Sequence, residues 1–150
     1  MATGDGFTSR LLVGGAEYLD ASGVGDWNPA GIYTSNQTGI LIRAIPPDPD
    51  RIVTLAAYPV GGNLPGMADH LTAIQFRLRG LPGNPRDCDD LADDIYDLLD
   101  GAQGLTWGGI PIVQMWRQSY TSLGDDANGR WQRSENYYLD TMRPTSNNSD

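Results

Sequence analysis

The sequence predicts an α+β fold, with two helices packed on a mixed, largely antiparallel β-sheet in the order α-β-β-β-α-β-β-β and with long hairpin loops. Two segments carry apolar residues at helical spacing, and several others alternate between apolar and polar residues as half-buried strands do. Links rich in Gly and Pro separate these segments. With 150 residues and no internal repeat, the chain is expected to form one domain, residues 1–150, whose ends at 1–6 and 144–150 are flexible.

The first helix is predicted over Phe7–Asp20, beginning at Phe7 or one residue later. Its apolar stripe consists of Leu11, Leu12, Ala16 and Leu19. Gly14 and Gly15 lie in the middle of this helix, where each Gly costs about 1 kcal/mol relative to Ala. We therefore expect the helix to approach the sheet or another neighbour closely at this point.

The next segment is expected to supply three strands, Ile40–Ile45, Arg51–Val60 and Leu71–Arg79. The proline-rich residues 46–50 mark a turn between the first two, because prolines are confined to strand ends and edges. Residues 61–70 form a long hairpin loop before the third. Strict alternation in the third strand puts one set of side chains on the core face: Thr72, Ile74, Phe76 and Leu78. It puts another set on a face that is either solvated or meets a partner: Gln75, Arg77 and Arg79.

The second helix is predicted to start at Asn84, a good N-cap, with Pro85 at its first position, and to stop before Gly101. Its apolar stripe consists of Cys88, Leu91, Ala92, Ile95, Leu98 and Leu99. Cys88 is the only cysteine, so no internal disulfide can form. Its place in the stripe indicates a small buried hydrophobic residue and not a nucleophile.

Three strands complete the predicted fold: Leu105–Trp107, Ile110–Ser119 and Ser134–Arg143. The first two are joined by Gly108-Gly109, which suits a two-residue hairpin turn because both central residues need positive φ. The last two are joined by residues 120–133, a polar, Gly-containing link of about fourteen residues. Loops of this length in compact domains are usually functional or disordered.

The charge of the chain excludes some classes of partner. Its net charge is −9, from seventeen Asp and two Glu against ten Arg and no Lys. This balance argues against sequence-independent nucleic-acid binding, which depends on cationic side chains that neutralise phosphates. It is compatible with a ring that encloses DNA and lets it slide past without specific binding. No apolar run approaches the roughly 18 residues of a membrane span, and no signal peptide is recognisable, so we expect synthesis in a cytoplasm and no membrane contact.

The second helix also carries the densest group of carboxylates, which is the best candidate for a metal site. The group lacks the Gly and Glu that an EF-hand loop requires, and no phosphate-binding Gly-rich loop accompanies it, so no metal or cofactor is predicted. Several of these carboxylates form like-charge i, i+4 pairs, which destabilise a helix by some tenths of a kcal/mol each. We expect this acidic face either to be a solvated surface or to line a DNA channel: Asp89, Asp90, Asp93, Asp94 and Asp97.

An enzymatic alternative, a small acidic hydrolase, rests on His70 beside Asp69. His70 is the only histidine, and the sequence has no GxSxG turn. No second base accompanies Ser119 or Ser122. We therefore predict no catalytic residues and no enzymatic activity.

The residues predicted to form subunit or partner interfaces are the two strand arginines and the charged residues around the indole of Trp131: Arg77, Arg79, Asp125, Asp126, Arg130, Trp131 and Arg133. An indole among arginines and carboxylates is a composition enriched at protein–protein contacts. The alternative is a solvated loop at 120–133 whose Trp131 folds back onto its own sheet.

The run RQSY, followed by LG-x-D-x-NGRW-x-RS-x-NYYLD, resembles the C-terminal part of a family of long-tailed bacteriophage proteins, the tail terminators, which are also described as minor capsid proteins. Earlier segments fit the same pattern: LLVGGAEYLDASGVGDWNP, TGILIRAIPPDPDR, LAAYPV and PRDCDDLADDIYDLL. The resemblance covers about residues 10 to 145 and depends on its extent and order, since no one motif in it is diagnostic.

The resemblance implies a structural virion protein that caps the tail tube as a hexameric ring and joins it to the head-completion proteins. The implied partners are further copies of the chain, the major tail tube protein and a head-completion protein, with genome DNA passing through. Such a ring requires heterologous contacts, for which we expect loops Gly61–His70 and Tyr120–Arg133 to be used. The protein would be assembled in the host cytoplasm and located at the head–tail junction. The alternative is a minor capsid or head-completion component at the portal.

Overall fold

A computed structural model describes residues 3–150 and has two helices and a seven-stranded mixed sheet. The elements are α1 (Phe7–Ala21), β1 (Asp26–Trp27), β2 (Gly39–Ile42), β3 (Ile52–Pro59), β4 (Asp69–Arg79), α2 (Asp87–Leu99), β5 (Gln103–Trp107), β6 (Ile110–Asp125) and β7 (Trp131–Met142). The predicted α+β class and element order are confirmed, with the two-residue strand β1 as an addition. No helix among residues 3–150 is long and apolar enough to cross a membrane.

The strands follow the order β1-β2-β3-β4-β7-β6-β5 across the sheet. β2 and β3 pair in parallel, with Gly39 opposite Ile52, whereas every pair from β3 to β5 is antiparallel. The proline-rich residues between β2 and β3 were expected to form a turn. They are instead part of a longer link, residues 43–51. This link runs from the end of β2 back to the level of its first residue, so that β3 can run parallel to β2.

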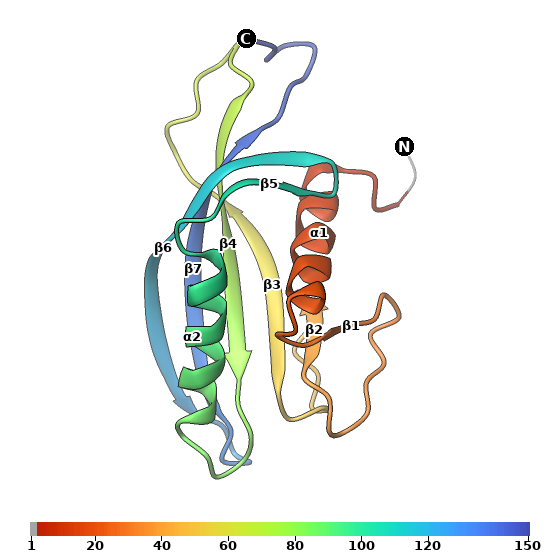
Figure 1. The fold of residues 1–150 in the computed structure, drawn as a ribbon, viewed down its shortest axis with the longest axis vertical. Helices are drawn as coiled ribbons and strands as arrows, with labels where there is room; N and C mark the ends of the chain where they lie inside the picture. The colour runs from red at the N-terminus through yellow and green to blue at the C-terminus, as the bar shows by residue number, and fades with distance from the viewer. Residues whose placement is uncertain (1–2) are drawn as a thin grey trace.

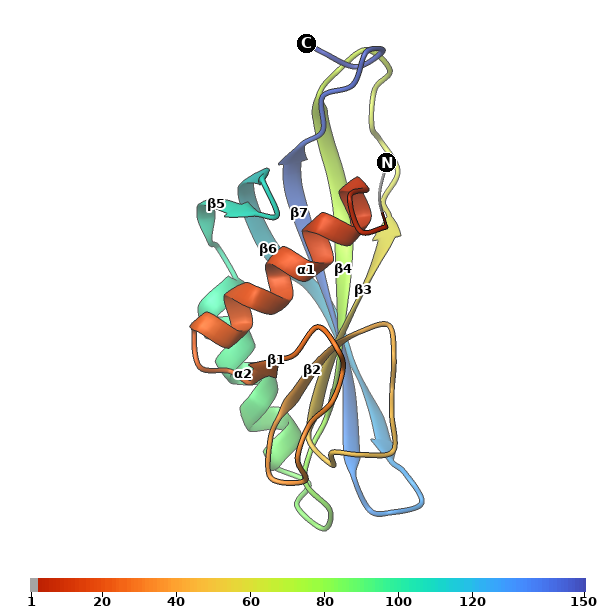
Figure 2. The ribbon, with the colours of Figure 1, turned by 90° about the vertical axis from the view of Figure 1, so that its right-hand side faces the viewer.

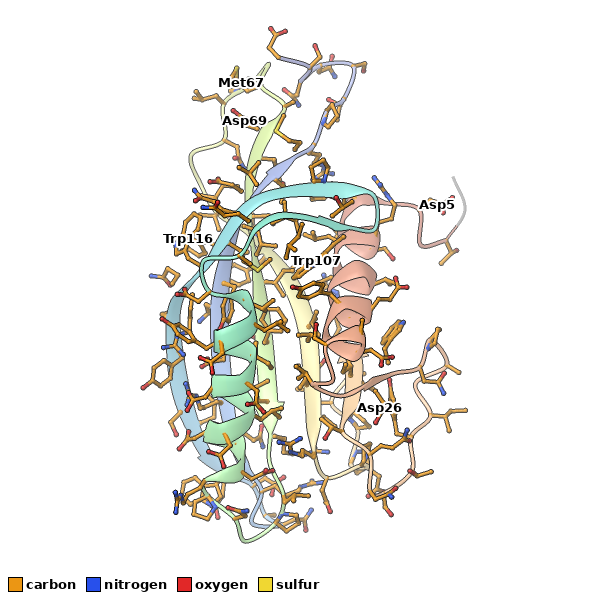
Figure 3. The ribbon with its side chains drawn as sticks, viewed as in Figure 1. Asp5, Asp26, Met67, Asp69, Trp107 and Trp116 are labelled. Atoms are coloured by element: carbon orange, nitrogen blue, oxygen red, sulfur yellow. The ribbon has the colours of Figure 1, made fainter. Side chains whose placement is uncertain are left out.

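Both helices lie on the same face of the sheet, and the core fills the space between them and the strands (Figures 1 and 2). Helix α1 approaches the β5–β6 hairpin closely, because a Cβ on Gly14 would lie 2.5 Å from the backbone nitrogen of Gly108. The predicted close approach is confirmed. Trp107 is held between α1 and the sheet by this contact (Figure 3).

The predicted start of the second helix was wrong by two residues: α2 begins at Asp87 with Arg86 at the N-cap, and Asn84 and Pro85 belong to the turn before it. The Asn84 side-chain oxygen accepts hydrogen bonds from the backbone N–H groups of Arg86 and Asp87, at 3.2 Å each. Gly101 follows the helix with a φ of 80°. Cys88 is buried in the core, and burial raises the pKa of its thiol to about 12. At neutral pH this thiol stays protonated and is therefore a poor nucleophile.

The link between the last two strands is much shorter than predicted. β6 and β7 extend to Asp125 and from Trp131, so that only residues 126–130 form the turn. The prediction of a polar loop over residues 120–133 was wrong. Its outer parts are strand residues at the end of a long hairpin, and β6 adapts to β7 through register shifts at three places, near residues 113, 118 and 123.

The other face of the sheet has no helix over it among residues 3–150 (Figure 2). Its centre carries aromatic and amide side chains: the Tyr58 hydroxyl donates a hydrogen bond to the Asn136 side-chain oxygen at 3.0 Å, and Trp116 lies edge-on to Tyr138. At one end of this face, residues 43–51 turn back against Arg79.

Beyond the other end of the sheet, the chain forms a projection that we call the arm, made of residues 60–70 and 143–150 (Figures 1 and 2).

Candidate partner interfaces

Arg79 is the centre of what we call the arginine end of the molecule, residues 43–51, 79–89 and 126–133. The Arg79 side chain is only 3% exposed although it lies on the face without helices. Its guanidinium donates hydrogen bonds to the backbone carbonyls of Asp50 at 2.7 Å, Pro46 at 2.8 Å and Pro49 at 2.7 Å. Arg79 therefore fixes the link between β2 and β3, because these carbonyls have no strand partner to bond with.

Arg130 joins the β6–β7 turn to the same link. Its guanidinium donates to Asp126 at 2.9 Å within the turn, and to Asp50 at 3.2 Å and the carbonyl of Pro47 at 2.6 Å across from it. Asp126 also accepts the backbone N–H of Arg130, and this bond, followed by the N–H of Asn128 and the Arg130 side chain, lowers the pKa of its carboxyl. The turn and the link are thus one hydrogen-bonded unit.

Glu135 forms a second charged cluster, on the helix-covered face. Its carboxylate is 0% exposed and receives Arg117 at 3.1 Å and Arg133 at 3.1 Å. Arg133 also pairs with Asp89 of α2 at 2.9 Å. The guanidinium groups of Arg117 and Arg133 both lie against the ring of Tyr120. Burial raises the pKa of Glu135, while the two arginines act to lower it. The cluster connects β6, β7 and α2 in place of an apolar core.

The structure separates the predicted interface residues into two groups. Buried side chains with partners in their own chain form the first group: Arg79, Arg130 and Arg133. In the second group, Arg77 lies on the face without helices and bonds the Gln132 side chain at 2.8 Å, and Asp125 is exposed at the end of β6. Trp131 packs partly buried against the core, as in the alternative of a ring folded back on its own sheet. Asp126 belongs to neither group, because it is half-buried in the turn and pairs with Arg130.

Glu135 was missed by the sequence analysis. The available signal was its position in strand β7, where it shares the alternation of Arg133, Tyr137 and Leu139 and so must point to the core. A glutamate at an inward position requires a buried cation as a partner.

The acidic face of α2 points away from the sheet. Its carboxylates are exposed, and Asp89 alone among the five predicted members is paired, with Arg133: Asp89, Asp90, Asp93, Asp94 and Asp97. Among residues 3–150, no group of three or more His, Cys, Asp or Glu side chains is placed to hold a metal ion. His70 packs edge-on to Phe7, and burial together with Arg143 lowers the pKa of its imidazole.

The arm is held by its own polar groups. The Asn63 side chain accepts the N–H of Leu71 at 2.8 Å and donates to its carbonyl at 3.0 Å. From the C-terminal side, the Asn148 side chain accepts the N–H of Gly66 at 2.7 Å, and the carbonyl of Asp150 accepts the N–H of Ala68 at 2.8 Å. Met67 and Asp69 lie near the end of this projection (Figure 3). The arm is therefore a defined shape, although its apolar side chains lack a core.

An apolar groove of about 570 Å³ lies beside β1 and β2. It is lined mainly by apolar side chains: Val13, Trp27, Pro29, Ala30, Ile40, Leu41, Ile42 and Ala44. Two exposed isoleucines, Ile32 at 72% and Ile45 at 43%, follow the lining residues Gly31 and Ala44 in the sequence. Exposed apolar patches of this kind commonly mark contacts with other proteins.

The family model of bacteriophage tail terminator proteins matches residues 18–142. A solved chain from the virion of a native gene transfer agent particle shares the fold, with a TM-score of 0.50, 14% identity and coverage of 68% of this chain and 78% of that chain. A second solved chain matches at a TM-score of 0.46 with 12% identity, over 93% of both chains. No curated protein sequence matches the chain.

Proposed function

Because the chain belongs to the bacteriophage tail terminator family, we propose that it caps the end of the tail tube as a hexameric ring and joins the tube to the head-completion proteins. The chain is a structural protein of the virion tail. The match over residues 18–142 supports the proposal most directly, since it spans every strand of the sheet from β1 to β7.

Binding is the whole of the proposed mechanism. Each subunit presents a rigid sheet, an ordered arm and a charged end whose arginines are already bonded within the chain. Contacts between different patches on successive copies close into a ring when the rotation between them fits a whole number of subunits. We assign no catalytic step to the protein.

The exposed carboxylates of α2 have a simple role in this proposal. Phosphates and carboxylates repel each other, so an acidic surface near the genome would not hold DNA and would let it pass. On the outside of the ring, the same surface would limit association to the contacts that are chemically complementary. In both positions the partner of the ring is protein and not nucleic acid.

Native mass spectrometry of the purified chain, with and without tubes of the major tail protein, tests the proposal. We expect a sixfold species, in solution or on tube ends, and electron microscopy should show a density that closes the end of the tube. A chain that stays monomeric and leaves the tubes unchanged would contradict it. A chain that binds the head-completion protein or the portal, and ignores tubes, would support the minor capsid alternative.

A further inference from the structure

We propose that the arm of one copy inserts its apolar tip, Leu64 and Met67, into the apolar groove beside β1 and β2 of the next copy. The partner is thus a second copy of this chain, and the contact is heterologous. This inference rests on the proposed ring function and names the contact that would build the ring.

The tip of the arm carries apolar surface that its own fold does not use. Leu64 is 68% exposed and Met67 is 39% exposed, and neither belongs to the core or to the residues packed on it. The backbone around them is nevertheless fixed by the bonds from Asn63, Asn148 and Asp150. A preordered projection loses little conformational entropy on binding, so its apolar tip is suited to docking.

The groove offers a matching surface. Its volume of about 570 Å³ lies within the range of about 300–1,000 Å³ that is usual for binding clefts, and it can take two apolar side chains. Trp27, Pro29 and Leu41 supply rigid or branched apolar walls. β1 pairs with β2 only as far as Ile40, so the next residues of β2, Leu41 and Ile42, have no strand partner on this side within residues 3–150.

An arginine stands beside the groove, and the arm carries more carboxylates than cations. Arg43 stands between the groove residues Ile42 and Ala44, is exposed, and has no ion pair or side-chain hydrogen bond within residues 3–150. Its backbone φ of 63° lies in the left-handed region, which residues other than glycine rarely adopt. The arm carries the exposed carboxylates of Asp69 and Asp150 and one exposed arginine, Arg143, whose guanidinium lies over the ring of Phe7. An inserted arm would bring these carboxylates toward the unpaired guanidinium of Arg43.

The placement of the two surfaces favours contact between copies. The arm projects beyond one end of the sheet, whereas β1 and β2 lie at the opposite end of α1 and at the edge of the sheet (Figures 1 and 2). One copy therefore cannot fill its own groove with its own arm. A chain with a docking tip at one place and a receptor at another associates head to tail.

Cysteine cross-linking tests the contact directly. Leu64→Cys places a thiol on the tip and Ala30→Cys places one in the groove, while the native Cys88 is buried and its thiol pKa is raised to about 12. A short bismaleimide is added to the purified protein, with and without tail tubes. Each single variant alone should give no cross-link, and their equimolar mixture should give a dimer only. The double variant should give a ladder of species up to the full ring.

A matched control replaces the groove cysteine. Ser35→Cys is an exposed position in the same link between β1 and β2 that does not line the groove, and combined with Leu64→Cys it should give no ladder. Leu64→Asp should weaken self-association by about tenfold or more, the effect expected when an interface anchor is lost. It should leave the circular dichroism spectrum unchanged.

Four results would overturn the inference. Cross-linking of Leu64→Cys to itself would indicate a tip-to-tip contact, its cross-linking to the tail tube protein would indicate a different partner, and a ladder that stops at two would indicate a twofold dimer. A sixfold species in native mass spectrometry without the ladder would reject this contact and leave the proposed function standing. Absence of any self-association or tube binding would reject the proposed function itself.

Discussion

Different groups hold the irregular backbone of the arginine end and of the arm: buried arginine side chains at the first, and amide side chains with backbone groups in the second. At the arginine end, Arg79, Arg130 and Arg133 are buried, and their partners all come from the same chain. In the arm, amide side chains and backbone groups hold the shape, and Leu64 stays exposed at its tip.

The difference indicates which region is free to bind. A buried arginine that already bonds carbonyls and carboxylates would lose these bonds if it turned to a partner, and leaving such groups unpaired costs about 1–3 kcal/mol each. An exposed leucine loses nothing in the same event and gains burial. At these two ends, therefore, the buried arginines hold the fold together, and the exposed apolar side chains of the arm are available for contact with a partner.

The largest expected effect is that of Glu135→Gln. The substitution keeps the shape but leaves Arg117 and Arg133 without a buried counter-charge, and breaking a buried charged cluster in this way costs about 3–5 kcal/mol. Urea unfolding followed by circular dichroism should show this loss. Asp94→Asn on the exposed face of α2 is the control and should change stability by less than about 0.5 kcal/mol. Equal effects of the two substitutions would contradict the view that the cluster is an internal one.

Arg79→Leu should cost less, about 2 kcal/mol, because it leaves the carbonyls of the 43–51 link without donors. Arg77→Leu, two residues earlier on the same face, removes only the bonds to the Gln132 side chain and should cost no more than about 0.5 kcal/mol. Urea unfolding of both variants measures the difference. If Arg77→Leu proved the more harmful, the assignment of Arg79 as the centre of the arginine end would fail.

In the arm, Asn148→Ala removes the acceptor for the Gly66 N–H. A net loss of about 1 kcal/mol per hydrogen bond predicts about fivefold faster hydrogen exchange at Gly66, with global stability nearly unchanged because the arm opens locally. Asn147→Ala is the matched control, since its side chain makes no hydrogen bond within residues 3–150. Hydrogen exchange at Gly66, measured by nuclear magnetic resonance, checks both variants. Identical exchange rates in the two variants would show that residues 143–150 do not hold residues 60–70 in place.

The smallest effect on stability is expected for Leu64→Ser, less than about 0.5 kcal/mol, because the side chain is mostly exposed. Leu81→Ser, at an exposed position of the arginine end, should be equally mild. The two variants should differ in assembly, where only Leu64→Ser reduces self-association in analytical ultracentrifugation. Loss of assembly by Leu81→Ser instead would reverse the comparison between the two ends.

Helices and tight turns were predictable because their signals are local. The apolar stripes and Gly108-Gly109 each act within a few residues of the chain and are found where the sequence indicates, whereas the second helix starts two residues later than Asn84 and Pro85 predicted. The parallel pairing of β2 with β3 was not predictable in this way. Parallel strands usually need a crossover of about a dozen residues or more. Residues 43–51 form a shorter connection, which is held by Arg79, a residue far from it in the sequence.

The environment of the predicted interface residues was also not predictable where it depends on residues far away in the sequence. Alternation correctly placed Arg77 and Arg79 on the face without helices, but the burial of Arg79 comes from a loop folded over it, which alternation cannot report. The polar residues after Ser119 looked like a loop because no apolar period marks them. They form a strand because β7 supplies their partners, and this pairing depends on residues far along the chain.

The register shifts in β6 have a consequence for the behaviour of the isolated protein. Past Arg117 this strand pairs with β7 on one side and with no other strand among residues 3–150 on its opposite side. A flat, unprotected strand in that position would recruit further chains and form aggregates. Bulges twist the strand and interrupt its row of hydrogen-bonding groups. The bulges thereby protect a molecule that we propose to join copies of itself from fibril growth, and its solubility should be most sensitive to changes that straighten this strand.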